Sequence, residues 1–159
     1  MSTTTAPGAV ALTLDTAQRE VLGEELAALA ASLRDPAARA PYEELAAAVG
    51  SGEVEEGLLG RLEGILEMSL QTGRVRRVYG AQSEQALLRL FHQTPRGAAA
   101  RRATQAVNDS LATLAGQTIE GMLFTVQGPG VFRLGLQTDH CRLTLEIDRH
   151  GVTVESLEV

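Results

Sequence analysis

The apolar residues of this chain change their spacing once, near residue 116, and this change constrains the fold more than any other feature of the sequence. Before that point they recur every three or four residues, which is typical of amphipathic helices. After it they alternate with polar residues, which is typical of strands that bury one face. A chain with its helices first and its strands last is expected to adopt an α+β fold in two layers.

Five helices are expected in the first part of the chain. The first begins at an N-cap, Asp15 or Thr16, and ends at Asp35-Pro36, because the residue before a proline disfavours helical backbone. The second starts at Pro41, since proline suits the first helical turn. The expected ranges are 15–34, 41–49, 53–71, 81–93 and 95–115.

The third of these helices contains three glycines at spacings of three and four residues, Gly57, Gly60 and Gly64. Each glycine in a helix interior costs about 1 kcal/mol relative to alanine. A glycine face also allows two backbones to approach closely. We therefore expect another helix to pack against this face.

Four short strands are expected after residue 117, joined by turns such as Gly128-Pro129-Gly130. Sequential strands with short connections form an antiparallel meander. One face of the meander is apolar, so we expect the helices to pack on that face. The last strand, which runs to Val159, is expected at a sheet edge, where a second copy or a partner strand is able to pair.

Length and composition are those of one ordinary domain. The chain has 159 residues, of which 44% are hydrophobic, and this is sufficient for one core. Residues 1–12 are expected to form a disordered leader. Residues 13–159 are expected to form a single α+β domain, helical over 13–116 and a β-meander over 117–159.

A cytoplasmic location is expected, with no membrane partner. No apolar run reaches the roughly 18 residues that a membrane span needs. The first residues lack the basic and apolar regions of a secretory signal. Every basic residue is an arginine, which is typical of a GC-rich bacterial genome.

The residue types exclude several kinds of chemistry. The absence of lysine removes Schiff-base catalysis and the lysine of phosphate-binding loops. A single cysteine, Cys141, excludes an intrachain disulfide and a cysteine-rich zinc site. It follows Asp139 and His140, but neighbouring strand residues point to opposite faces, so no nucleophilic site is expected there. The sequence favours a non-enzymatic protein with no catalytic residue, metal site or cofactor.

Charge lies in blocks along the chain. Residues 1–70 contain 4 Arg and 12 acidic residues, residues 71–105 contain 7 Arg and 1 acidic residue, and residues 106–159 contain 3 Arg and 7 acidic residues. Because the planar guanidinium group binds carboxylates and phosphates in a bidentate manner, the central block is the expected binding site for an anionic partner. Its arginines are Arg74, Arg76, Arg77, Arg89, Arg96, Arg101 and Arg102.

Three functions are consistent with this arginine segment, residues 74–102. The favoured one is an interaction protein (adaptor, chaperone-like protein or regulatory subunit) that forms a homodimer and docks an anionic partner, such as an acidic protein. The first alternative is a nucleic-acid-binding protein in which 81–93 and 95–115 form a helix-turn-helix-like pair. The second is a binder of small anionic ligands, or an enzyme, with its site at the N-terminus of helix 95–115. Pairing with the chain's own acidic helices would explain the same charges structurally.

Overall fold

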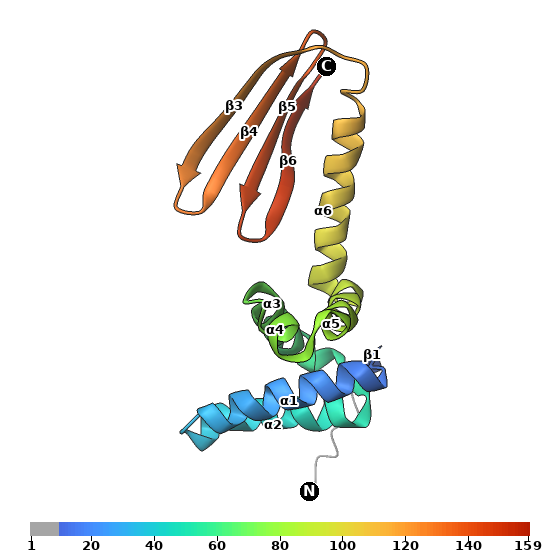
Figure 1. Cartoon of the computed structure of the whole chain (residues 1–159), viewed down its shortest axis with the longest axis vertical. Helices are drawn as coiled ribbons and strands as arrows, with labels where there is room; N and C mark the ends of the chain where they lie inside the picture. The colour runs from blue at the N-terminus through green and yellow to red at the C-terminus, as the bar shows by residue number, and fades with distance from the viewer. Residues whose placement is uncertain (1–9) are drawn as a thin grey trace, which may run out of the picture. The chain divides into compact units, whose positions relative to one another are not determined.

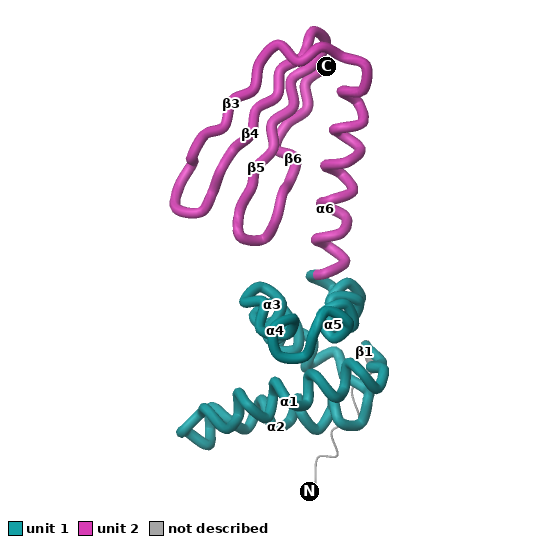
Figure 2. Tube along the Cα trace, viewed as in Figure 1, with its two compact units in different colours: residues 1–96 teal, residues 97–159 magenta. Residues whose placement is uncertain are grey.

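The computed structural model describes residues 10–159 and confirms the expected α+β fold (Figure 1). A helical part comes first, and a four-stranded antiparallel sheet follows it. The chain divides into two compact units (Figure 2), called here the helical unit, residues 1–96, and the sheet unit, residues 97–159. The boundary expected near residue 116 separates helices from strands, whereas the structure groups most of the last helix with the strands.

Between residues 10 and 96, the helical unit contains seven complete helices and strands. They are β1 (Val10–Thr13), α1 (Thr16–Ser32), α2 (Pro36–Ser51), β2 (Glu53–Glu55), α3 (Leu59–Gln71), α4 (Arg74–Tyr79) and α5 (Ala81–Gln93), with a 3₁₀ turn at Glu56–Leu58. Helix α6 (Pro95–Ala112) begins at the boundary and lies mostly in the sheet unit. The strands of that unit are β3 (Ile119–Gly128), β4 (Val131–Thr138), β5 (Arg142–Asp148) and β6 (Gly151–Glu158).

Strand β1 occupies the end of the segment expected to be a disordered leader. Residues 1–9 of that leader lie outside the described residues, but Val10–Thr13 pairs antiparallel with β2. Leu12 lies opposite Val54, and both side chains are buried. This pairing joins residues forty or more positions apart, so local periodicity does not reveal it. Because β2 and the 3₁₀ turn occupy residues 53–58, α3 starts later than the expected helix 53–71.

Within the described residues, no other helix packs against the glycines of the α3 region. Gly57, Gly60 and Gly64 are exposed, and a Cβ atom placed on any of them would meet no other atom within 4 Å. The expected close approach of a neighbouring backbone is therefore wrong. Helix α3 instead turns its leucines toward the core and leaves the glycine face open.

Helix α2 begins one turn and a half before its expected start. Asp35 caps it, since its carboxylate accepts a 3.0 Å hydrogen bond from the backbone N–H of Ala37, and Pro36 is the first helical residue. Asp35-Pro36 therefore ends one helix and starts the next. Pro41 lies inside the helix, at the cost of one backbone hydrogen bond.

Helix α4 forms from a segment expected to connect two helices. It is flanked by Gly73 and Gly80, whose φ angles are 63° and 90°. Glycine adopts both positive φ angles without a steric penalty, so the chain turns sharply before and after six helical residues. Val75 of α4 is buried in the core.

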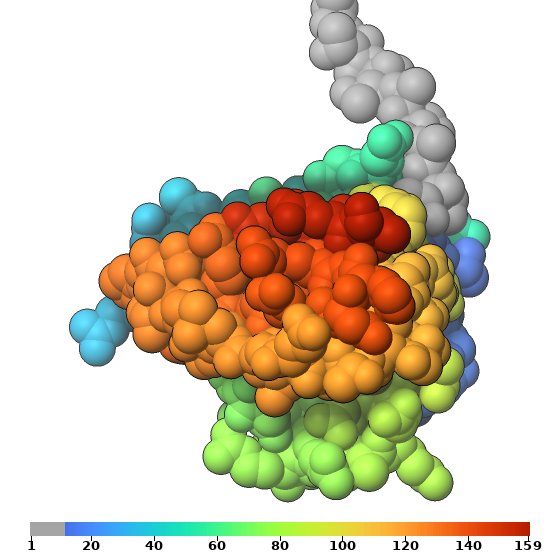
Figure 3. Space-filling model, turned by 90° about the horizontal axis from the view of Figure 1, so that it is seen from above, coloured from blue at the N-terminus to red at the C-terminus, as the bar shows by residue number. Residues whose placement is uncertain are grey.

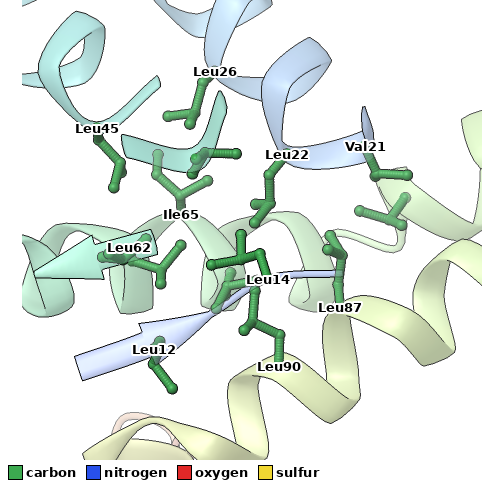
Figure 4. Close-up of a cluster of buried hydrophobic side chains, with 14 residues drawn as sticks. Leu12, Leu14, Val21, Leu22, Leu26, Leu45, Leu62, Ile65, Leu87 and Leu90 are labelled. Carbon is green, nitrogen blue, oxygen red and sulfur yellow. The ribbon is translucent and has the colours of Figure 1, made fainter. Parts of the chain in front are cut away.

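Leucines dominate the core of the helical unit. Figure 4 shows them converging from α1, α2, α3 and α5, with Leu12 and Leu14 between the helices. The fully buried leucines include Leu22 and Leu26 of α1. Its N-terminus is fixed by the expected cap Asp15, whose carboxylate accepts from the backbone N–H of Gln18 at 2.8 Å.

The sheet unit is the expected four-stranded meander, in the order β3-β4-β5-β6. One face is apolar on every strand, and α6 packs against that face. Val107 of α6 contacts a cluster of buried side chains, Leu136, Leu143 and Leu145. Among the helices within residues 10–159, none is long and apolar enough to cross a membrane.

Candidate functional site

The seven arginines of segment 74–102 fall into both units. Arg74, Arg76 and Arg77 lie on α4 and Arg89 on α5, all in the helical unit. Helix α6 carries the other three, with Arg96 at the end of the helical unit and Arg101 and Arg102 in the sheet unit. The structure also assigns the two helices of the helix-turn-helix alternative, 81–93 and most of 95–115, to different units.

Arg74 neutralises a carboxylate in the interior of the helical unit. Its Nε atom donates to Glu25 Oε1 at 2.9 Å and to Oε2 at 3.1 Å. Glu25 lies on α1, and its side chain is only 6% exposed. Its Oε1 also accepts from the Tyr79 hydroxyl at 3.0 Å, and its Oε2 accepts from Ser69 Oγ at 3.4 Å. One carboxylate on α1 thus joins α3 and α4.

The pKa of the Tyr79 hydroxyl is raised by its burial beside Glu25. Burial of the phenol and its hydrogen bond to the Glu25 carboxylate raise the pKa of Tyr79 to about 12. Desolvation and the nearby negative charge both disfavour the phenolate. At neutral pH the hydroxyl is therefore a firm donor to Glu25.

Arg96 neutralises a second buried carboxylate, Glu63 of α3, whose side chain is 6% exposed. The backbone N–H of Arg96 donates to Glu63 Oε1 at 2.7 Å, and its Nε lies 3.2 Å from Glu63 Oε2. Its Nη1 also lies 3.1 Å from Glu67 Oε2. A helix N-terminus attracts an anion, and at α6 that anion is the chain's own Glu63. The site expected for a small anionic ligand therefore already holds a carboxylate.

All seven arginines are exposed, and the other five contact no buried carboxylate. Arg76 lies 3.7 Å from Glu84, and Arg77 donates to the carbonyl of Thr72 at 3.2 Å. Within residues 10–159, no ion pair is formed by Arg77, Arg89, Arg101 or Arg102. The arginine segment thus contains two structural members, Arg74 and Arg96, and four charges that no carboxylate of the described chain neutralises.

Sequence reasoning missed Glu25 and Glu63. A signal was present, because each lies in phase with the leucines that line its helix, Glu25 between Leu22 and Leu26 and Glu63 beside Leu62. A carboxylate on the apolar face of a helix is expected to be buried and paired. The many exposed glutamates of the same helices obscured this signal.

The side chains of Asp139, His140 and Cys141 do not gather at one site. His140 is exposed and lies 3.6 Å from Asp139. Cys141 is buried, and its Sγ atom lies 3.3 Å from Thr138 Oγ1 and from Gln117 Oε1. In the described part of the chain, no three His, Cys, Asp or Glu side chains gather as a metal ion would require.

Strand β3 is the most exposed apolar element. Ile119, Met122, Leu123, Phe124 and Val126 are between 56% and 69% exposed. Met122, Phe124 and Val126 continue the apolar face beyond the part that α6 covers, and Phe124 stacks on Phe132 with ring centroids 5.6 Å apart. The atoms of β3 to β6, light orange to red, form part of the molecular surface in Figure 3.

The opposite face of β3 borders a shallow hollow of ≈ 410 Å³. It lies over Gly121 and Gly135, which have no side chains to fill it, and Leu123 borders it. Arg133 and Arg142 also line it, but Arg133 is paired with Glu155 and Arg142 donates to Gln137 at 3.1 Å.

The expected open edge was the last strand, β6, and the structure places both β3 and β6 at edges. Only β3 presents large apolar side chains there. Its sequence carried a signal, because Gly121 to Phe132 contains no charged residue and Met122-Leu123-Phe124 interrupts the alternation.

Comparison with protein-family models found no match, and comparisons with curated proteins and with solved structures found no similar chain.

Proposed function

We propose that the protein is a cytoplasmic interaction protein that forms a homodimer and docks an acidic protein partner through its exposed arginines. The observation that carries the docking proposal is the state of Arg101 and Arg102. Both are exposed on α6, and neither forms an ion pair within the described residues. No acidic residue lies between Arg96 and Asp109 to balance them.

The position of these two arginines supports a role outside the helix. Arg101 and Arg102 lie beyond the first turn of α6, where the helix macrodipole no longer acts on them, and no ion pair within the described residues holds them to the helix. Their guanidinium groups offer planar pairs of donors, which match the two oxygens of a carboxylate. Arg77 and Arg89 provide further exposed charge in the helical unit.

Binding of a labelled polyglutamate peptide, followed by fluorescence anisotropy at low and physiological salt, tests the docking proposal. The variant Arg101→Glu with Arg102→Glu is expected to lose about 10-fold or more in affinity, because two charge-assisted contacts become repulsive. Arg96 is left intact, because it neutralises Glu63. The matched control, Arg34→Glu with Arg149→Glu, changes the same charge at other exposed positions.

The same experiment includes labelled duplex DNA. Tighter binding of DNA than of polyglutamate, with a steep loss of affinity as salt rises, would favour the nucleic-acid alternative. An equal loss of affinity in the control variant would show that the effect comes from net charge and not from Arg101 and Arg102. No binding of either probe at low salt would overturn docking through these arginines.

A further inference from the structure

We propose that two copies of the chain associate through β3, which lies antiparallel beside its own copy so that the two sheets become one of eight strands. The inference rests on the homodimer in the proposed function and names the surface that forms it. It is independent of the exposed arginines.

Exposure on both faces of β3 points to a strand as its partner. Met122, Phe124 and Val126 lie on one face and Leu123 on the other, and all are more than half exposed. The outer backbone N–H and C=O groups of an edge strand also lack a ladder partner. A helix or loop covers one face, whereas a neighbouring strand contacts the edge and the side chains of both faces at once.

The other edge of the same sheet shows what a protected edge looks like. The exposed side chains of β6 include Thr153, Glu155 and Glu158, and charged side chains discourage pairing with another chain. Strand β3 has one charged residue, Glu120, which lies where its register with β4 shifts. The two edges thus differ in the feature that decides whether an edge pairs.

A second copy fits β3 because the strand is compatible with itself. Two-fold symmetry and the strand pleat require the pairing to centre on one residue, and Phe124 lies near the middle of β3. Centring there places Met122 opposite the copy's Val126 and Glu120 opposite the copy's Gly128. Phe124 then lies opposite its own copy between two Met122–Val126 pairs, Leu123 lies opposite the copy's Thr125, and the two Glu120 carboxylates lie about 27 Å apart at opposite ends.

The apolar area of β3 matches a small dimer interface. Fully burying one such side chain removes roughly 60–120 Å² of apolar surface, so five side chains that are 56–69% exposed offer about 400–700 Å² in two copies. A specific interface needs about 1,000 Å² in total, of which a little over half is apolar. We therefore expect a reversible dimer weaker than standard-size complexes.

Sedimentation of the full chain from about 1 µM to about 200 µM tests the inference. The mass is expected to rise from 16.8 kDa toward twice that value. The variant Met122→Lys with Val126→Lys is expected to raise the dimer dissociation constant about 10-fold or more, since like charges face one another at two symmetric places. The control, Asn108→Lys with Thr153→Lys, adds the same charge at exposed positions of α6 and β6 and is expected to dimerise like the wild type.

A charge-swap mixture makes the test independent of misfolding. A second variant carries Met122→Glu with Val126→Glu and is expected to be monomeric alone. Mixed in equal amounts, the lysine and glutamate variants are expected to recover the dimer mass, because each places its charges opposite those of the other. Recovery requires both variants to be folded.

Three outcomes would overturn the β3 inference. A wild type that stays at 16.8 kDa throughout leaves no dimer at all and also removes the homodimer from the proposed function. A wild-type dimer that both charge variants retain keeps the homodimer but places its interface elsewhere. Monomeric variants that do not recover dimer mass on mixing, while their circular dichroism matches the wild type, exclude direct β3–β3 contact.

Discussion

The helical unit and the sheet unit differ in how completely they bury their apolar side chains. The helical unit encloses its leucines and buries two carboxylates, Glu25 and Glu63, each neutralised by an arginine. The sheet unit buries a small cluster under α6 and leaves the apolar side chains of β3 exposed. The first arrangement is complete within one copy of the chain, whereas the second is completed by an additional strand in our proposal.

The largest effect is expected from a cavity in the helical unit. Leu22→Ala removes a fully buried side chain of α1 and is expected to lower the free energy of unfolding by about 2–5 kcal/mol. Met122→Ala removes a side chain that is 68% exposed on β3 and is expected to cost less than about 0.5 kcal/mol. Urea denaturation at low protein concentration measures both. Equal costs would contradict the difference between the units.

Removal of an arginine that neutralises a buried carboxylate is expected to have the next largest effect. Arg74→Ala leaves Glu25 buried without its cationic partner and is expected to cost about 1–3 kcal/mol. Arg77→Ala is the matched control, because Arg77 lies on the same helix but forms no ion pair within the described residues, and it is expected to change stability by less than about 0.5 kcal/mol. Adding Glu25→Gln to Arg74→Ala is expected to restore part of the loss, because the uncompensated charge is removed. A loss that Glu25→Gln deepens further would contradict this explanation.

High pH is expected to weaken the same network. The pKa of Tyr79 is about 12 in the folded protein and about 10 when unfolded. A pKa raised by folding means that the stabilisation is complete below pH about 10 and is lost as pH rises toward about 12. The difference in unfolding free energy between the wild type and Tyr79→Phe is therefore expected to shrink over that interval. A difference that stays constant would show that the Tyr79 hydroxyl does not titrate with folding.

The smallest expected effect is a gain in the stability of the helical unit. Gly64 lies within α3, is exposed, and has open space where a Cβ atom would be placed. Gly64→Ala is expected to raise the free energy of unfolding by about 0.5–1 kcal/mol, because alanine has less backbone freedom to lose. Thermal unfolding by circular dichroism measures the gain. A loss of stability would mean that this face packs against something after all.

The sequence predicts elements best where periodicity is long and the ends are marked. The range 81–93 coincides with α5, and the four strands appear in the expected order. Short elements were missed, because β2 and α4 have three and six residues and depend on partners distant in the chain. Pro41 by itself indicates a helix start, but Asp35-Pro36 both ends α1 and starts α2, so Pro41 lies inside the second helix.

The candidate site was predictable by residue type but not by pairing. The sequence identified the arginines of segment 74–102, but Arg74 and Glu25 are 49 positions apart, and the choice among many acidic residues depends on the fold. The exposure of β3 was hidden for a related reason. Its alternating apolar residues resemble those of β5, and only the position of α6 determines which strand is covered.

The buried thiol of Cys141 gives the sheet unit its own reporter. It is the single cysteine of the chain, and no cysteine lies in residues 1–96. A thiol reagent reaches it when the surrounding strands open, so its labelling rate measures the opening equilibrium of that unit alone. Slower labelling at higher protein concentration would reveal that self-association restrains those opening motions, without any added dye or tag in the helical unit.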